Sequence, residues 1–270
     1  MKKLSPLFWV GVGFLILVMV FAIVGPNVRH SWQNATGHVR MPPGSDHWLG
    51  TDEQGRDVFA RLAYGARITL IIGLSVQSLA LIVGVTVGVL GVFGPRWLSS
   101  ALLRLTDGMF AFPDLLLAIM LVGLFGRGTW PVVTSLAIAS WPGVARLART
   151  QIASFKDREF VVAAKAMGAT VPYLVRRHIL PHLVGILLAI AMVDVAAVIL
   201  SESTLSFLGI GVQLPETSWG GMIQGGNSQK ESNPLLLLWP CLALASTVFA
   251  LNFVGDGLRK VFDPTASHVR

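Results

Sequence analysis

Residues 68–94 read ITLIIGLSVQSLALIVGVTVGVLGVFG and contain no charged side chain. The hydrocarbon core of a bilayer is about 30 Å thick, and an α-helix needs about 20 apolar residues to cross it. Within this stretch, Gly84 and Gly88 form a G-x-x-x-G pair, which lets helix backbones approach closely in lipid. The stretch therefore predicts a transmembrane helix that packs inside a bundle.

Five further apolar runs indicate a multi-pass membrane protein. They are residues 7–24, 108–126, 129–145, 183–201 and 235–254. Only 13% of the residues are charged and 53% are hydrophobic, whereas about a quarter of the residues of a soluble domain are charged. The sequence therefore predicts an all-α integral membrane protein with six transmembrane helices.

The first apolar run has an alternative interpretation as a secretory signal peptide, because Lys2 and Lys3 precede it. The run is longer than the apolar core of a signal peptide, about 7 to 15 residues, and no clear cleavage site follows it. We therefore expect residues 1–25 to form a short cytoplasmic N-terminus and an uncleaved transmembrane helix.

Basic side chains favour an orientation with both termini in the cytoplasm. Lys and Arg are densest between Arg146 and Arg177, and such an excess is typical of cytoplasmic loops. Basic residues in cytoplasmic loops therefore explain the net charge of +7 without a nucleic-acid partner. The predicted segments are an extracytoplasmic loop at 26–67, a five-helix core at 68–256 with an extracytoplasmic segment at 204–234, and a cytoplasmic tail at 257–270. Residues 55–67 have helix-like apolar spacing and are predicted to lie along the membrane surface.

A basic segment at 155–182 predicts a compact helix-turn-helix knob. It reads VAAKAMG over residues 162–168 and HILP over residues 178–181. In this interpretation Gly168 stops the first helix and Pro181 closes the second. The residues alone leave two alternatives open, a knob that docks into a partner or an amphipathic loop on the membrane surface.

The segment resembles the EAA loop of binding-protein-dependent ABC importers, Glu-Ala-Ala-x3-Gly-x9-Ile-x-Leu-Pro, by which the permease docks on its ATPase. The matching residues are Ala163, Ala164, Gly168, Leu180 and Pro181. Two positions depart from the pattern: Val162 replaces the Glu and His178 replaces the Ile. The resemblance implies that these residues form a coupling loop.

Three other stretches resemble the second (C-type) permease subunit of oligopeptide, dipeptide and nickel importers. They are HWLGTDEQGRD at 47–57 with YGAR at 64–67, SESTLSFLGIGVQ at 201–213 with SWG at 218–220, and NFVGDGLR at 252–259 with Asp263 and Pro264. The resemblance covers nearly the whole chain after residue 47. It implies a type I ABC importer permease fold (MetI-like) that passes peptides, related small solutes, nickel or a metal chelate across a bacterial plasma membrane.

The resemblance also implies a set of partners. They are a homologous second permease subunit, two ATP-binding subunits, membrane lipid and an extracytoplasmic solute-binding protein that docks outside. The expected contact region for the binding protein contains Asp52, Arg56, Asp57 and Trp219. The chain has no Gly-Lys pair, so a G-x-x-x-x-G-K-[ST] phosphate loop is absent. We therefore expect no enzyme activity and no bound cofactor here, with ATP and Mg held by the partner subunits.

Acidic residues within the predicted spans are candidates for the pathway or the bundle interior. An Asp at a helix centre costs about 2.5 to 3.5 kcal/mol unless it finds water or a partner. Asp194 is predicted to line the pathway or to bond a neighbouring helix, and Glu202 to cap or position the 204–234 segment. Asp107 and Asp114 flank Phe110–Pro113 and are interpreted as helix caps beside a proline break.

Histidines in two segments are candidate metal ligands. His30, His38 and His47 share the outer loop, and His178 and His182 are four residues apart. We expect no metal site, because Pro181 disturbs the second spacing and no carboxylate completes a set.

Two other functional classes are alternatives. An ion-gradient-driven secondary transporter would show inverted repeats and paired broken helices, and a membrane-embedded enzyme would need a clustered nucleophile, base or metal set. Neither pattern is visible in the sequence.

Overall fold

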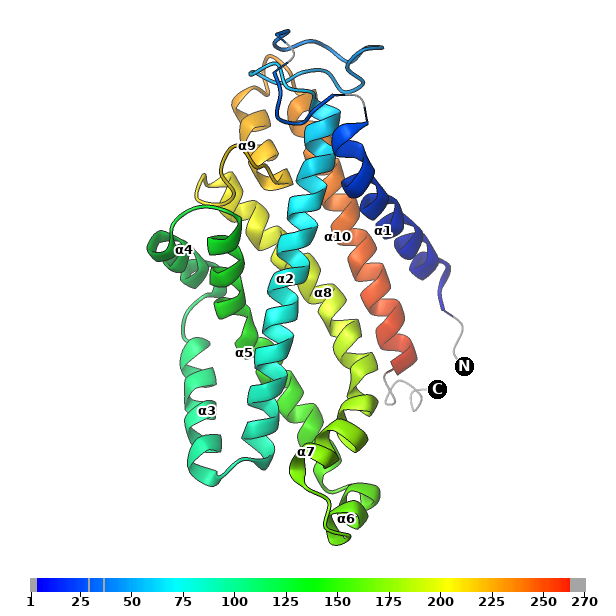
Figure 1. Ribbon diagram of the computed structural model, residues 1–270, viewed down its shortest axis with the longest axis vertical. Helices are drawn as coiled ribbons and strands as arrows, with labels where there is room; N and C mark the ends of the chain where they lie inside the picture. The colour runs from blue at the N-terminus through cyan, green and yellow to red at the C-terminus, as the bar shows by residue number, and fades with distance from the viewer. Residues whose placement is uncertain (1–3, 29, 36, 263–270) are drawn as a thin grey trace.

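The computed structural model describes residues 4–28, 30–35 and 37–262, and this part of the chain is predominantly helical. Figure 1 shows an elongated bundle with the loop before α2 at one end and α6 at the other. The elements are α1 Pro6–Val24, a 3-10 turn Gly25–Asn27, α2 Val58–Phe93, α3 Arg96–Met109, α4 Asp114–Phe125, α5 Thr129–Lys156, α6 Glu159–Ala166, α7 Val171–Leu174, a π turn Val175–Ile179, α8 Leu180–Phe207, α9 Trp219–Ser228 and α10 Leu235–Phe262.

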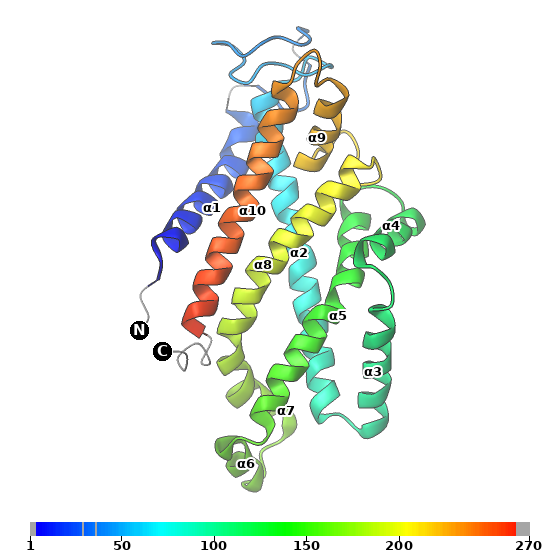
Figure 2. The same ribbon diagram turned by 180° about the vertical axis from the view of Figure 1, so that it is seen from behind.

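Helices α2, α5, α8 and α10 form the centre of the bundle. Helix α2 packs along α5 and α8, α8 packs along α10, and α1 covers α10 on one flank (Figures 1 and 2). A Cβ built on Gly84 would lie 2.6 Å from Val144 Cγ1, and one built on Gly88 would lie 2.9 Å from Ala148 Cβ. These glycines leave no room for side chains, so the predicted close approach is confirmed, and the neighbouring helix is α5.

The described residues contain four helices long and apolar enough to cross a membrane. They are α1, α2, the continuous helix Val171–Phe207 and α10, and they contain four of the predicted spans. The number becomes five if α3 and α4, which are bent by 93°, form one span. Helix α5 has 28 residues but fails this test, because polar residues and the start of the basic segment dilute its apolar run. The predicted count of six is therefore not confirmed.

The predicted third span, 108–126, was wrong as a single helix. The chain turns between Met109 and Asp114, and α4 has only 12 residues, about 18 Å of helix, which is too short to cross a bilayer. Pro113 is the N-cap of α4, and a proline disfavours helical geometry at the residue before it. The predicted proline break is therefore confirmed, and the chain changes direction there.

Helix α2 begins at Val58, so the external loop ends ten residues earlier than the predicted boundary at 67. The Asp57 carboxylate caps this helix by accepting a hydrogen bond from Ala60 N at 2.8 Å. The separate surface helix predicted for 55–67 was wrong, because residues 58–67 form the first turns of α2. The predicted span began after Arg61 and Arg67, because residues 68–94 carry no charge. In the structure Arg61 is part of α2, and its side chain is buried against the loop rather than solvated.

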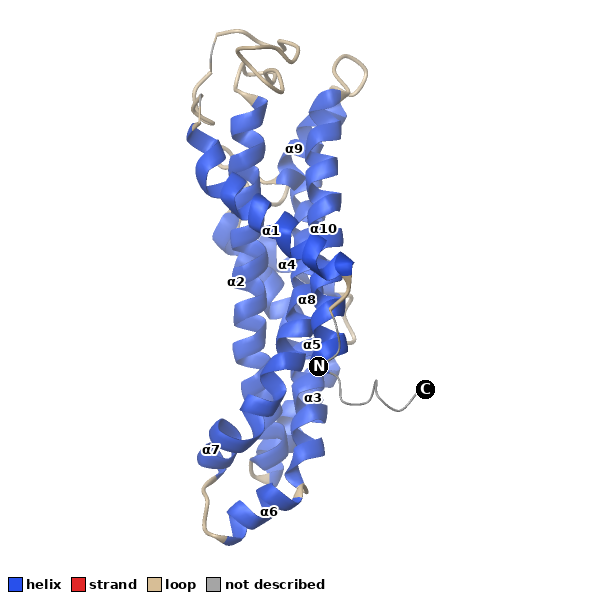
Figure 3. Ribbon diagram, turned by 90° about the vertical axis from the view of Figure 1, so that its right-hand side faces the viewer, coloured by secondary structure: helices blue, strands red, loops and turns tan. Residues whose placement is uncertain are grey.

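The predicted knob at 155–182 is confirmed only in its first half. Helix α6 ends before Gly168, whose φ is +87°, a conformation that favours glycine. Pro181 does not close the second helix, because α7, the π turn and α8 run on as one helix. A proline inside a regular α-helix clashes with the carbonyl group four residues earlier. The stretch before Pro181 is not a regular α-helix but the wider π turn. Figure 3 shows α6 and α7 at the far end of the bundle from the long loop.

Two predicted features extend beyond the part of the chain that the structure describes. They are the N-terminal residues Lys2 and Lys3, and the C-terminal motif residues Asp263 and Pro264 with the rest of the tail.

Candidate functional site: an end loop, a polar cavity and the opposite face

The end loop is α6 with the turn that follows it. Val161 and Ala164 are buried in an apolar cluster with Ile152 of α5, Ile179 of the π turn and Leu183 of α8. This cluster fixes α6 to the ends of two long helices. The opposite side of α6 is open to solvent, where Val162 and Met167 are 52% and 82% exposed.

A groove of about 660 Å³ runs between α6 and α7. It is lined by Phe160, Ala163, Ala164, Met167, Gly168, Ala169, Thr170, Tyr173 and His178. Four residues of the motif therefore meet in one groove, whereas Leu180 and Pro181 lie in α8 and Val162 is not among the lining residues.

The rings of His178 and His182 both lie near an aromatic ring, and His182 also contacts a backbone carbonyl group. The Phe160 ring lies 5.5 Å from the His182 ring and 6.3 Å from the His178 ring, and His182 Nδ1 lies 2.6 Å from the carbonyl oxygen of His178. No group of three potential metal ligands that includes them occurs among the described residues.

A polar cavity of about 470 Å³ opens inside the helix bundle. Asp194 of α8 lines it and accepts a hydrogen bond from Gln77 Nε2 of α2 at 3.3 Å. The hydrogen bond to a neighbouring helix is therefore present, and Asp194 also faces a cavity, while its role in the translocation pathway stays a prediction. The other polar lining residues are Asp114, Ser140, Ser201 and Arg259. Gln77 was not identified from the sequence, where it is one amide in a long apolar run.

Glu202 is fully buried in α8 and anchors the chain after that helix. Its Oε1 accepts a hydrogen bond from Ser206 Oγ at 2.7 Å. Ser206 Oγ in turn lies 3.2 Å from both the backbone N–H of Val212 and the hydroxyl of Ser218. This network fixes the segment between α8 and α9 to the end of α8.

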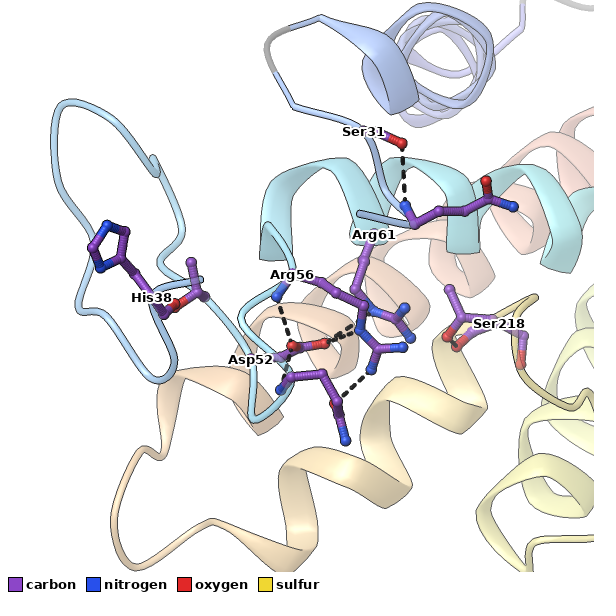
Figure 4. Close-up of polar contacts among 10 residues, drawn as sticks. Ser31, His38, Asp52, Arg56, Arg61 and Ser218 are labelled. Carbon is purple, nitrogen blue, oxygen red and sulfur yellow. Dashed lines mark hydrogen bonds and ion pairs between the residues drawn. The ribbon is translucent and has the colours of Figure 1, made fainter. Parts of the chain in front are cut away.

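At the other end of the bundle from α6, the side chains of Arg56 and Arg61 both contact Asp52 (Figure 4). Asp52 Oδ2 lies 2.8 Å from Arg56 Nε and 3.3 Å from Arg61 Nε. This cluster forms one wall of a cavity of about 450 Å³, whose other wall comes from residues 209–229. Arg61 Nη1 is buried and has no hydrogen-bond partner within the described chain. This unpaired guanidinium nitrogen is therefore enclosed within the fold.

Two of the four residues expected to contact a binding protein are buried. Trp219 is 1% exposed and donates hydrogen bonds from its backbone N to Thr69 Oγ1 at 3.2 Å and from Nε1 to the carbonyl oxygen of Leu62 at 3.0 Å. Asp57 is 3% exposed and caps α2. Neither side chain is available at the surface, so direct contact by them was a wrong expectation. They hold α9 and the loop against α2, whereas Asp52 and Arg56 remain partly accessible.

The structure also brings together three side chains of the external loop. His30, Asp46 and His47 offer ligand atoms that all lie within 4.8 Å of one another. Asp46 supplies a carboxylate, so the expectation that no carboxylate completes a set was wrong for the histidines of the outer loop. His38 is exposed and is not part of this group.

These features define a class: an all-helical membrane permease, with a polar cavity between its helices, a folded loop at one end and no phosphate-binding loop in its sequence. Residues 80–268 match the family described as the binding-protein-dependent transport system inner membrane component. The chain belongs to this family and is a permease subunit of a binding-protein-dependent ABC importer.

Curated relatives extend the match over most of the chain. The dipeptide transport system permease protein DppC of Bacillus subtilis is 36% identical and aligns with 97% of this chain and 83% of its own length. The oligopeptide permease OppC of the same organism is 34% identical, with 94% and 84% covered. A putative peptide permease of Brucella suis is 40% identical, with 83% and 75% covered.

A solved structure shares the fold. The MetNI methionine ABC transporter in an inward-facing conformation matches with a TM-score of 0.61 and 18% identity, covering 74% of this chain and 95% of that chain. The predicted MetI-like fold and the predicted family are therefore confirmed. The secondary-transporter alternative finds no support, and the family is one of permease subunits rather than of ATPases.

Proposed function

We propose that this subunit forms half of the translocation pathway for peptides or related small solutes across a bacterial plasma membrane. A homologous second permease subunit supplies the other half. Two partner subunits hydrolyse ATP with Mg²⁺, and this chain binds neither. The similarity to dipeptide and oligopeptide permeases over 97% and 94% of the chain supports the cargo class.

The polar cavity is the single observation that supports the proposed translocation pathway. Its walls are mostly apolar, and they carry two acidic side chains, Asp114 and Asp194, and one basic side chain, Arg259. A peptide with free ends carries an ammonium and a carboxylate group, and each needs a partner once it leaves water. A cavity with both charges therefore suits a zwitterionic cargo.

Both termini lie in the cytoplasm in this proposal, and α6 faces the ATPases. Arg158, Lys165, Arg176 and Arg177 are exposed around α6 and α7, and an excess of such residues is typical of the cytoplasmic side.

The groove between α6 and α7 couples ATP hydrolysis to alternating access. The cluster beneath it ties α6 to both α5 and α8, so a movement of the groove reaches two helices that line the polar cavity. Nucleotide-driven closure can shift the permease only by the difference in contact free energy between its two states. The ATPase must therefore contact the groove differently in each state.

The solute-binding protein docks on the opposite face, around the cavity lined by Asp52 and Arg56. The exposed residues Glu53 and Gln54 are among the residues that line it.

Reconstituted transport tests the proposal. The complete complex is placed in liposomes with its binding protein outside and ATP inside, and uptake of a labelled dipeptide is measured with each component omitted in turn. We expect uptake only when ATP and the binding protein are both present. Uptake driven by an ion gradient without ATP would contradict the proposal, and uptake of nickel with no dipeptide uptake would contradict the cargo.

A further inference from the structure

The external loop contains two imidazoles and a carboxylate grouped as a set of metal ligands. His30 follows the 3-10 turn after α1, whereas Asp46 and His47 lie at the far end of the loop. Their ligand atoms lie within 4.8 Å of one another. Two ligand atoms on one tetrahedral zinc ion lie about 3.3 Å apart. Asp46 is exposed and His30 is partly exposed, so side-chain rotation can close the difference.

His47 is already oriented as a ligand. Its Nδ1 lies 2.8 Å from Oδ2 of Asp57, and a carboxylate oxygen accepts hydrogen bonds, so Nδ1 donates. The lone pair of the neutral ring then lies on Nε2. Asp57 is itself fixed, because its Oδ1 accepts from Ala60 N at 2.8 Å. A carboxylate that holds the second nitrogen of a histidine is the arrangement that typically orients metal-bound histidines.

The types of ligand suit one small transition-metal ion, and a small cavity lies beside them. A cavity of about 10 Å³, about the volume that one water molecule needs, lies beside the group and is lined by His30, Asp46 and Asp57 but not by His47. Imidazole ligands favour ions such as Zn²⁺, whereas Ca²⁺ and Mg²⁺ require shells of oxygen atoms. Two nitrogens and one carboxylate oxygen leave one position of a tetrahedral site for water or another ligand.

We propose that His30, Asp46 and His47 bind a divalent transition-metal ion, with Asp57 as a positioning residue. The ion would join the chain leaving α1 to the segment that enters α2. It would therefore fasten both ends of the external loop on the face that carries the Asp52 cluster. The inference does not depend on which solute the subunit transports.

The test measures zinc binding to the purified complete complex, isolated with a tag that contains no histidine and stripped with a chelator. We expect the wild type to bind Zn²⁺ at this subunit, and His30→Ala or Asp46→Asn to weaken that binding at least tenfold. His38→Ala is the matched control, because it removes an exposed histidine of the same loop and should leave binding unchanged. Co²⁺ in place of Zn²⁺ should give the absorption of a tetrahedral site in the wild type and not in His30→Ala.

Thermal unfolding separates loss of the site from loss of the fold. Zinc should raise the melting temperature of the wild type and of His38→Ala, but not that of His30→Ala, while the three proteins melt alike without metal. Zinc binding that survives His30→Ala and Asp46→Asn, or that disappears in His182→Ala instead, would overturn the proposal. So would the absence of zinc binding by the wild type.

Discussion

Gln77 of α2 donates a hydrogen bond to Asp194 of α8 at 3.3 Å, and both side chains line the same cavity. The pair connects two helices that are far apart in sequence. The oxygen of the Gln77 amide, Oε1, is buried without a hydrogen-bond partner in the described chain. The pair is thus both a link between helices and a polar surface in the cavity.

Two substitutions of Asp194 separate these roles. Asp194→Asn keeps a hydrogen-bond acceptor but removes the charge, so we expect dipeptide uptake to fall about tenfold with little change in stability. Asp194→Leu also leaves the Gln77 amide unpaired, which costs about 1 to 3 kcal/mol of stability. Liposome uptake and thermal unfolding of the complex measure the two effects. Wild-type behaviour of both variants would place Asp194 outside the pathway.

The groove between α6 and α7 predicts a position-specific effect on ATPase binding. Ala163 lines the groove, whereas Ala166 is exposed on the same helix and does not line it. Ala163→Trp should fill the groove and reduce the amount of ATPase that copurifies, and Ala166→Trp should not. Equal copurification with both variants would contradict docking in this groove.

Gly168 predicts a backbone effect rather than a steric one. No atom outside its immediate chain neighbours lies within 4 Å of a Cβ built on it, but its φ is +87°. An L-residue there costs about 1 to 2 kcal/mol, and Asn tolerates this region better than Ala. We expect protection of α6 from hydrogen exchange, and ATPase copurification, to fall in the order Gly, Asn, Ala. If Gly168→Ala matched the wild type in both measurements, the turn would not need its glycine.

The α2–α5 crossing predicts a packing defect. A methyl group on Gly84 would overlap Val144 and the backbone of Ala145, and overpacking typically costs about 1 to 3 kcal/mol. Gly84→Ala should therefore lower the melting temperature of the complex. Gly123→Ala in α4 is the control, because no other part of the described chain lies near that position. An equal melting temperature for the two variants would contradict this account.

Local sequence patterns predicted the transmembrane helices and the features encoded by short motifs. The apolar runs located α1, α2, α8 and α10, the Gly84–Gly88 pair predicted a close helix crossing, and Gly168 marked the end of α6. Each of these depends on residues close in sequence.

Features that depend on distant residues could not be predicted. The start of α2 was missed because Arg61 looks solvated in sequence, and only the folded loop brings Asp52 to it. The pair of Gln77 with Asp194 and the group of His30, Asp46 and His47 likewise arise from tertiary contact. The burial of Trp219 follows from its docking on α2, which a motif match does not reveal.

Helix α2 runs unbroken for 36 residues, which is about 54 Å. Its first turn is capped beside the loop that carries Asp52, and its last turns, at Val89 and Phe93, pack against the apolar cluster that holds α6. A rigid rod of this length acts as a lever, because a tilt of about 10° would displace one end relative to the other by about 9 Å. Events on the two sides of the membrane can therefore be mechanically linked through a single element, with no joint in between to absorb the motion.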